Sequence, residues 1–190
     1  MVSVACRMIV LNGVSSSGKS SIARALQARL PEPWLVFAVD DLIAAMPPSM
    51  PADAGGITFG SDGAVTVGDR FIALNVAWEH GIAAMVRAGA PVIVDDLFLR
   101  GRTNQDRWRA ALGDLPVLWV GVHCEPAVLA EREQARGDRA IGMAAGQLPL
   151  VHTGVGYGLE VNTTHQSPEA CAALIVARLG EASTARDGCR

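Results

Sequence analysis

The chain has 190 residues, of which half are hydrophobic and 18% are charged, a composition typical of a compact globular protein. This length favours one domain with a sizeable core, so we expect a single domain over residues 1–180 and a disordered tail over 181–190, where small and polar residues dominate. The net charge of −3, the pI near 5.8 and the lack of a basic run argue against nucleic acid or an anionic membrane as a partner.

Targeting signals are also missing from the sequence. The first residues lack the charged start and the long apolar stretch of a signal peptide. No apolar run approaches the ~20 residues of a membrane span. We therefore expect a cytoplasmic protein, and the sequence leaves its oligomeric state open.

Short apolar runs alternate with helical patterns along the chain. Runs typical of strands lie at 8–11, 34–39, 92–94, 117–122 and 159–161, and helical patterns lie at 21–30, 42–46, 70–88, 103–112, 126–136, 139–147 and 168–179. Strands that are apolar throughout and alternate with helices indicate an α/β fold, with a mostly parallel sheet of about five strands covered by helices on both faces. Ligands of such sheets bind beyond the carboxyl ends of the strands.

Residues 13–20 match the phosphate-binding pattern G-x-x-x-x-G-K-[ST] at every fixed position, between a predicted strand and a predicted helix. The two glycines allow the backbone to turn its N–H groups around a polyphosphate, and the start of the helix adds the positive end of its dipole. We predict a P-loop NTPase or kinase fold, with Lys19 on the outer phosphates and Ser20 as a ligand of Mg²⁺. The predicted nucleotide-binding residues are Gly13, Val14, Ser15, Ser16, Ser17, Gly18, Lys19 and Ser20.

Pairs of aspartates follow the second and third predicted strands. Asp40 and Asp41 lie where a P-loop kinase faces its acceptor, so we expect both on the substrate side, with Asp40 as the catalytic base and Asp41 at the start of a helix. Asp95 and Asp96 come next to the third strand. We assign Asp95 to Mg²⁺, opposite Ser20, and Asp96 to the acceptor side. The alternative for each pair is that one aspartate only caps a loop or helix.

Three arginines lie within residues 132–139, broken by a Gly-Asp turn. This pattern is typical of the lid of small P-loop kinases, and we place the lid region at about 126–147. We expect Arg136 and Arg139, rather than Arg132, to close over ATP, with Arg136 neutralising charge on the transferred phosphoryl group. The alternative is an exposed helix end in which Arg132 and Arg136 form i,i+4 pairs.

The segment from about 47 to 70 departs from the α/β pattern and carries a hairpin signal at 62–63. We interpret it as an insertion that builds the acceptor pocket, with walls from Phe59, Met46, Met50 and Phe98. An ordinary surface hairpin is the alternative. Few basic residues lie nearby, which argues against a strongly anionic acceptor, although Arg100 and Arg102 could bring positive charge.

Beyond the P-loop, the sequence resembles the chloramphenicol phosphotransferase family, kinases that phosphorylate the 3-hydroxyl of chloramphenicol. The resemblance extends from about Arg7 to about Leu179. The segments that carry it are 7–20, 30–35, 39–40, 55–57, 95–99, 117–122, 135–139, 142–145, 151–152 and 161–165.

The resemblance implies a fold related to shikimate and adenylate kinases, ATP with Mg²⁺, a small-molecule antibiotic as substrate, and one catalytic aspartate at Asp40. The loop departs from the family at variable positions, with Gly-Val-Ser-Ser-Ser in place of Gly-Gly-Ser-Ser-Ala. Differences over 48–70 and 100–102 concern the acceptor pocket. Two other functions stay open: a metabolic kinase for a sugar acid or nucleoside, and a regulatory nucleotide-binding ATPase.

Overall fold

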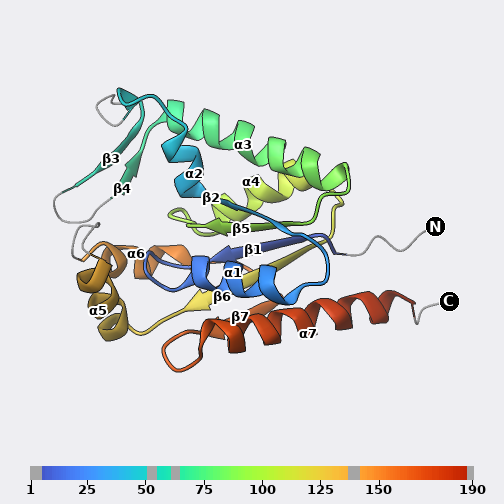
Figure 1. The fold of residues 1–190 in the computed structure, drawn as a ribbon. Helices are drawn as coiled ribbons and strands as arrows, with labels where there is room; N and C mark the ends of the chain where they lie inside the picture. Colours follow the sequence, from blue (N-terminus) through green and yellow to red (C-terminus); the bar gives the residue numbers. More distant parts are fainter. Residues whose placement is uncertain (1–5, 51–54, 61–64, 137–141, 188–190) are drawn as a thin grey trace.

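The computed structural model describes residues 6–50, 55–60, 65–136 and 142–187. Its centre is a parallel five-stranded sheet in the order β2-β5-β1-β6-β7 (Figure 1). The strands are β1 (Met8–Asn12), β2 (Leu35–Ala38), β5 (Val92–Asp96), β6 (Val117–His123) and β7 (Leu159–Asn162). The predicted α/β fold with a parallel sheet of about five strands is therefore confirmed.

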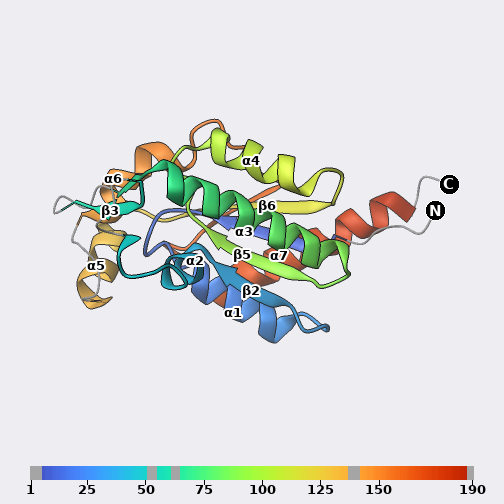
Figure 2. The same ribbon diagram turned by 90° about the horizontal axis from the view of Figure 1, so that it is seen from above.

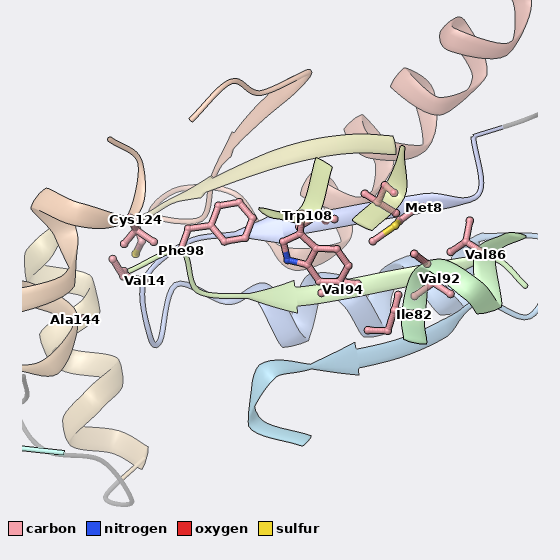
Figure 3. Close-up of a cluster of buried hydrophobic side chains, with 14 of the residues drawn as sticks. Met8, Val14, Ile82, Val86, Val92, Val94, Phe98, Trp108, Cys124 and Ala144 are labelled. Carbon is pink, nitrogen blue, oxygen red and sulfur yellow. The ribbon is translucent and has the colours of Figure 1, made fainter. Parts of the chain in front are cut away.

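Helices cover both faces of this sheet: in Figure 1, α3 (Asp69–Arg87) and α4 (Arg102–Leu112) lie above it, and α1 (Lys19–Arg29) and α7 (Pro168–Asp187) lie below it. Figure 2 shows α3 in front of the sheet. Alternate residues of β1 face opposite sides, which divides the core into two clusters. Met8 and Val10 pack with residues of α3 and α4, whereas Ile9 and Leu11 pack with residues of α1 and α7. Figure 3 shows the first cluster, in which Trp108 is completely buried. The apolar strands are thus covered on both sides, as their sequences predicted.

The remaining elements gather at the carboxyl end of the sheet, away from both chain termini (Figure 1). They are α2 (Val39–Ala44), β3 (Ile57–Phe59), β4 (Val65–Val67), α5 (Pro126–Arg136) and α6 (Met143–Val151). β3 and β4 pair antiparallel, as the hairpin signal predicted. None of the helices in the described ranges is long and apolar enough to cross a membrane.

Three helix boundaries differ from the sequence predictions. α2 begins at Val39, so Asp40 and Asp41 lie in its first turn, where carboxylates interact favourably with the helix dipole. α6 begins at Met143 because Gly142 adopts a left-handed conformation, with φ 91°, immediately before it. α7 continues to Asp187, so most of the segment expected as a disordered tail is helical. The segment 181–187 contains neither proline nor glycine, so nothing in it interrupts the helix.

Candidate active site

The P-loop connects β1 to α1 in a conformation that its glycines make possible. A Cβ atom at Gly13 would lie 2.4 Å from the carbonyl oxygen of Val122 in β6, a distance that no side chain tolerates. Gly18 has φ 93° and immediately precedes α1, and Ser16 is also in the left-handed region, with φ 60°. Strained residues of this kind persist where the surrounding structure holds them, and they concentrate at binding sites.

Two hydroxyl groups of this loop have no hydrogen-bond partner in the described part of the chain, and backbone carbonyl groups hold its lysine. The hydroxyl oxygens of Ser16 and Ser17 are buried without a hydrogen bond, and no side chain caps the start of α1. The Lys19 ammonium donates to the carbonyl oxygens of Gly13 and Val14, at 2.9 and 3.0 Å. Open N–H groups at a helix start, hydroxyls and an ammonium together form an anion site. The loop therefore fits the phosphates of a nucleotide.

Asp95 lies opposite the P-loop at the end of β5. Its Oδ2 accepts a 2.6 Å hydrogen bond from the Ser20 hydroxyl, and its Oδ1 lies 3.5 Å from the Lys19 Nζ. The structure thus brings together the two residues that we predicted as Mg²⁺ ligands. A hydroxyl and one carboxylate, with phosphate oxygens and water, are the donors that Mg²⁺ uses in kinase sites. These residues fit that ion.

A cleft of about 560 Å³ lies along the P-loop, and its walls include Ser16, Lys19, Asp95 and Arg132. The Arg132 guanidinium donates to the Ser16 carbonyl oxygen at 3.4 Å, and to the carbonyl oxygen and hydroxyl of Thr163 at 2.9 and 3.2 Å. Arg132 is therefore the arginine that the structure places against the P-loop. We expected this of the other two lid arginines. Arg136 ends α5, and Arg139 lies outside the described residues.

A second, smaller cavity of about 70 Å³ lies beside this cleft, between α2, the β3–β4 hairpin, α3 and α6. Asp40 lines both spaces. Apolar walls come from both strands of the hairpin, from α2 and from Phe71 in α3, whereas Met46 and Met50, which we expected there, are not among the lining residues. The polar lining residues other than Asp40 are Asn75, Asp96, Arg100, Asn104, Arg107 and Gln147. This volume holds about two water molecules, so a larger occupant requires the hairpin and α6 to move apart.

Asp96, which we predicted on the acceptor side, forms part of the wall of this smaller cavity. Only 3% of the residue is exposed. Its carboxylate accepts hydrogen bonds from the Trp108 indole N–H and from the Leu97 backbone N–H, each 2.7 Å long. Burial raises the pKa of Asp96, while these two donors oppose the rise. The bonds fix the carboxylate in the cavity wall.

Arg107 and Glu79 form a buried ion pair that the sequence analysis did not anticipate. The guanidinium makes three hydrogen bonds of 2.7 to 2.9 Å to the fully buried carboxylate. Burial raises the pKa of Glu79 to about 7, and the bonds from Arg107 oppose this rise. A signal did exist in the sequence, because Asn75 and Glu79 follow Phe71 at helical spacing on the buried side of α3.

Two predicted substrate residues line neither cavity: Asp41, which takes the helix-start role that we also predicted for it, and Phe98. The Asp41 carboxylate accepts a 2.7 Å hydrogen bond from the Ala38 N–H, so it caps α2, and this residue lines neither space. Phe98 is completely buried in the core cluster that Figure 3 shows, and its ring packs against Trp119. Its backbone N–H donates to the side chain of Asn12, which turns the loop after β5 inward. Phe59 lies in β3, paired with Val65.

Comparison with known sequences agrees with this geometry. The family described as chloramphenicol phosphotransferase-like protein matches residues 6–180. The chain belongs to this family. A protein of Mycobacterium tuberculosis (strain ATCC 25618 / H37Rv), described as an inferred O-phosphotransferase, is 29% identical over 191 residues, which cover 87% of this chain and 83% of that protein. This chloramphenicol phosphotransferase-like protein is therefore a phosphotransferase with a P-loop kinase fold.

Solved structures show the same fold at lower sequence identity. A sugar kinase from Janibacter sp. HTCC2649 is 18% identical, with a TM-score of 0.68 over 92% of this chain and 94% of its own. A gluconokinase from Sinorhizobium meliloti 1021 is 22% identical, with a TM-score of 0.67 over 95% of each chain. At these identities the likeness concerns the fold alone, so the acceptor has to be argued from the site.

Proposed function

We propose that this phosphotransferase transfers the γ-phosphoryl group of ATP to a hydroxyl of a small molecule, and that the acceptor is the 3-hydroxyl of chloramphenicol. The position of Asp40 carries the proposal, because this residue lines both the P-loop cleft and the smaller cavity. A base at such a boundary reaches a hydroxyl in one space and directs it toward a phosphate in the other. Membership of the chloramphenicol phosphotransferase-like family supports the choice of acceptor.

In the proposed reaction, the oxygen of the acceptor hydroxyl bonds to the γ-phosphorus while Asp40 accepts the proton of that hydroxyl. The bond from the γ-phosphorus to the bridging oxygen breaks, and ADP leaves. Lys19 leaves the carbonyl oxygens of its own loop for the phosphates. Arg132 adds positive charge from α5, and we retain Arg136 and Arg139 as lid arginines. Bound Mg²⁺, held through Ser20 and Asp95, would neutralise developing charge on the phosphate oxygens.

A sugar acid is the second candidate acceptor. The observation in its favour is Arg100, which lines the smaller cavity and whose guanidinium makes no hydrogen bond or ion pair with the described residues. A free guanidinium is suited to a carboxylate. Arg107, by contrast, is already bound to Glu79.

ATP consumption with chloramphenicol, beside an analogue with fluorine in place of the 3-hydroxyl, tests the proposal. We expect chloramphenicol alone to stimulate turnover. Asp40→Ala should lower kcat by about 10²- to 10⁴-fold, because a positioned base contributes that factor, while the Kd for ATP changes little. Asp41→Ala is the matched control, since its carboxylate only caps α2, and it should retain turnover. Near-normal kcat in Asp40→Ala would refute the assigned role.

The same assay of ATP consumption with gluconate distinguishes the two candidate acceptors. Stimulation by gluconate and not by chloramphenicol would move the proposal to the sugar-acid acceptor, and Arg100→Met should then raise the KM for gluconate. Equal ATP hydrolysis with and without every alcohol would indicate a nucleotide-binding ATPase without an acceptor.

A further inference from the structure

Gln147 in α6 joins the P-loop to the smaller cavity. The residue is 3% exposed and lines that cavity, as does Met143 one helical turn earlier. The position of α6 is fixed by Glu133 in α5, whose carboxylate accepts hydrogen bonds from the N–H groups of Gly142 and Ala144, at 3.0 and 2.7 Å. Gln147 therefore sits on an anchored helix start, which limits its freedom to move.

The orientation of the Gln147 amide follows from its bond to the P-loop. The Ser15 backbone N–H lies 2.8 Å from one end of the amide, and only the oxygen Oε1 can accept from that donor. The other end is therefore Nε2, and this nitrogen is buried without a hydrogen-bond partner among the described residues. An amide N–H group shut away from water without an acceptor is unfavourable, and such exceptions call for an explanation.

Asn75, which lines the same cavity, has the opposite feature: a buried acceptor without a donor in the described ranges. Its Nδ2 donates to the Glu79 carboxylate at 3.2 Å, and its Oδ1 is buried without a partner in the described part of the chain. The residue is 4% exposed and lines the cavity from α3. The hairpin offers only apolar side chains here, from Ile57, Val65 and Val67, and these cannot satisfy either group. The walls thus hold one unused donor and one unused acceptor.

We propose that Gln147 is an acceptor-recognition residue, whose Nε2 donates to a second hydroxyl of the substrate while its Oε1 holds the P-loop through Ser15. A hydroxyl both accepts and donates hydrogen bonds, so it can satisfy Nε2 and also serve Asn75 Oδ1. The substrate class is therefore a diol, with the reacting hydroxyl at Asp40 and the second one at Gln147. This inference rests on the proposed function and adds to it the feature that selects the acceptor.

The test is the ratio of kcat/KM for a diol to kcat/KM for its deoxy analogue. Chloramphenicol carries a second hydroxyl on the same three-carbon chain as the reacting one, and 1-deoxychloramphenicol lacks it. The wild type should prefer chloramphenicol by about tenfold or more, the factor expected when a buried donor loses its acceptor. Gln147→Met, which keeps the side-chain length but has no donor, should lower this ratio severalfold, and the contact of the hydroxyl with Asn75 should keep the ratio above one.

Leu150→Met is the matched control, because Leu150 is on the exposed side of the same helix, 46% exposed. This variant should keep the wild-type ratio. A merely structural role of Gln147 would lower turnover of both compounds equally and leave the ratio unchanged, which would overturn the inference. A wild type without preference would also overturn it.

Failure of the proposed function looks different from failure of the role of Gln147. If the wild type used neither chloramphenicol nor its analogue but phosphorylated gluconate, the antibiotic assignment would fall, and the same ratio would be measured with gluconate and a deoxygluconate. A ratio unaffected by Gln147→Met would then still overturn the role of Gln147. Absence of turnover with every alcohol would overturn both proposals.

Discussion

Replacing Glu79 with glutamine tests the electrostatics of the ion pair beside the smaller cavity. The carboxylate is fully buried, and its pKa rises from 4.5 to about 7 in the folded protein. Between these values the folded state binds more protons than the unfolded state, so the free energy of unfolding falls as pH rises. At about 1.4 kcal/mol for each pH unit, the loss from Glu79 reaches about 3 kcal/mol by pH 8.

Urea unfolding of the wild type and Glu79→Gln at pH 5, 6, 7 and 8 measures this effect. The slope of the free energy of unfolding against pH in the wild type does not by itself report on Glu79, because other groups contribute to it. The pKa of His152 is lowered to about 4, which makes its own contribution increase with pH up to about 6.5. The difference between the two proteins isolates Glu79: it should shift by about 2.5 kcal/mol against the wild type from pH 5 to pH 8. Parallel curves for Glu79→Gln would show that Arg107 keeps Glu79 ionised over the whole range.

Two further predictions concern the loops and the metal site. Gly101→Ala places a Cβ 2.3 Å from the Thr153 carbonyl oxygen at φ 49°, and it should lower the free energy of unfolding by more than about 2 kcal/mol. Gly146→Ala in α6 meets nothing within 4 Å and should raise it by up to about 1 kcal/mol; equal effects in urea titrations would contradict the backbone argument. Ser20→Ala should raise the Mg²⁺ concentration needed for half-maximal ATP turnover at least about tenfold, and an unchanged Mg²⁺ titration would remove Ser20 from the metal site.

The features that the sequence predicted well are those encoded locally. The P-loop motif, the apolar strands and the aspartates that follow them each occupy a few consecutive residues, and the parallel sheet brings their ends to one edge. Asp40 and Asp41 are both acidic residues at a helix start, so their separate roles rested on a chemical argument alone. In the structure, Asp40 lines both cavities and the Asp41 carboxylate accepts from the Ala38 N–H.

The features that the sequence did not reveal depend on contacts between distant elements. Gln147 follows no motif, and its role emerges only where α6 meets the P-loop. Phe98 follows a strand that ends at the site, but the bond from its N–H to Asn12 turns the ring inward. Arg132 and Arg136 lie one turn apart on the same helix. Sequence spacing therefore did not show that Arg132 reaches Thr163 and the P-loop.

The close approach of Gly13 to Val122 affects the order in which the chain folds during its synthesis. β1 pairs with β5 and β6, and both of these strands are synthesised long after the nucleotide-binding motif has left the ribosome. A nascent chain that ends before β5 carries the complete motif but none of the strands that hold it in shape. Because ATP stabilises only a state that binds it, nucleotide in the cell should assist folding only after β6 has emerged. The best-defined stretch of the sequence is thus among the last parts of the molecule to acquire its structure.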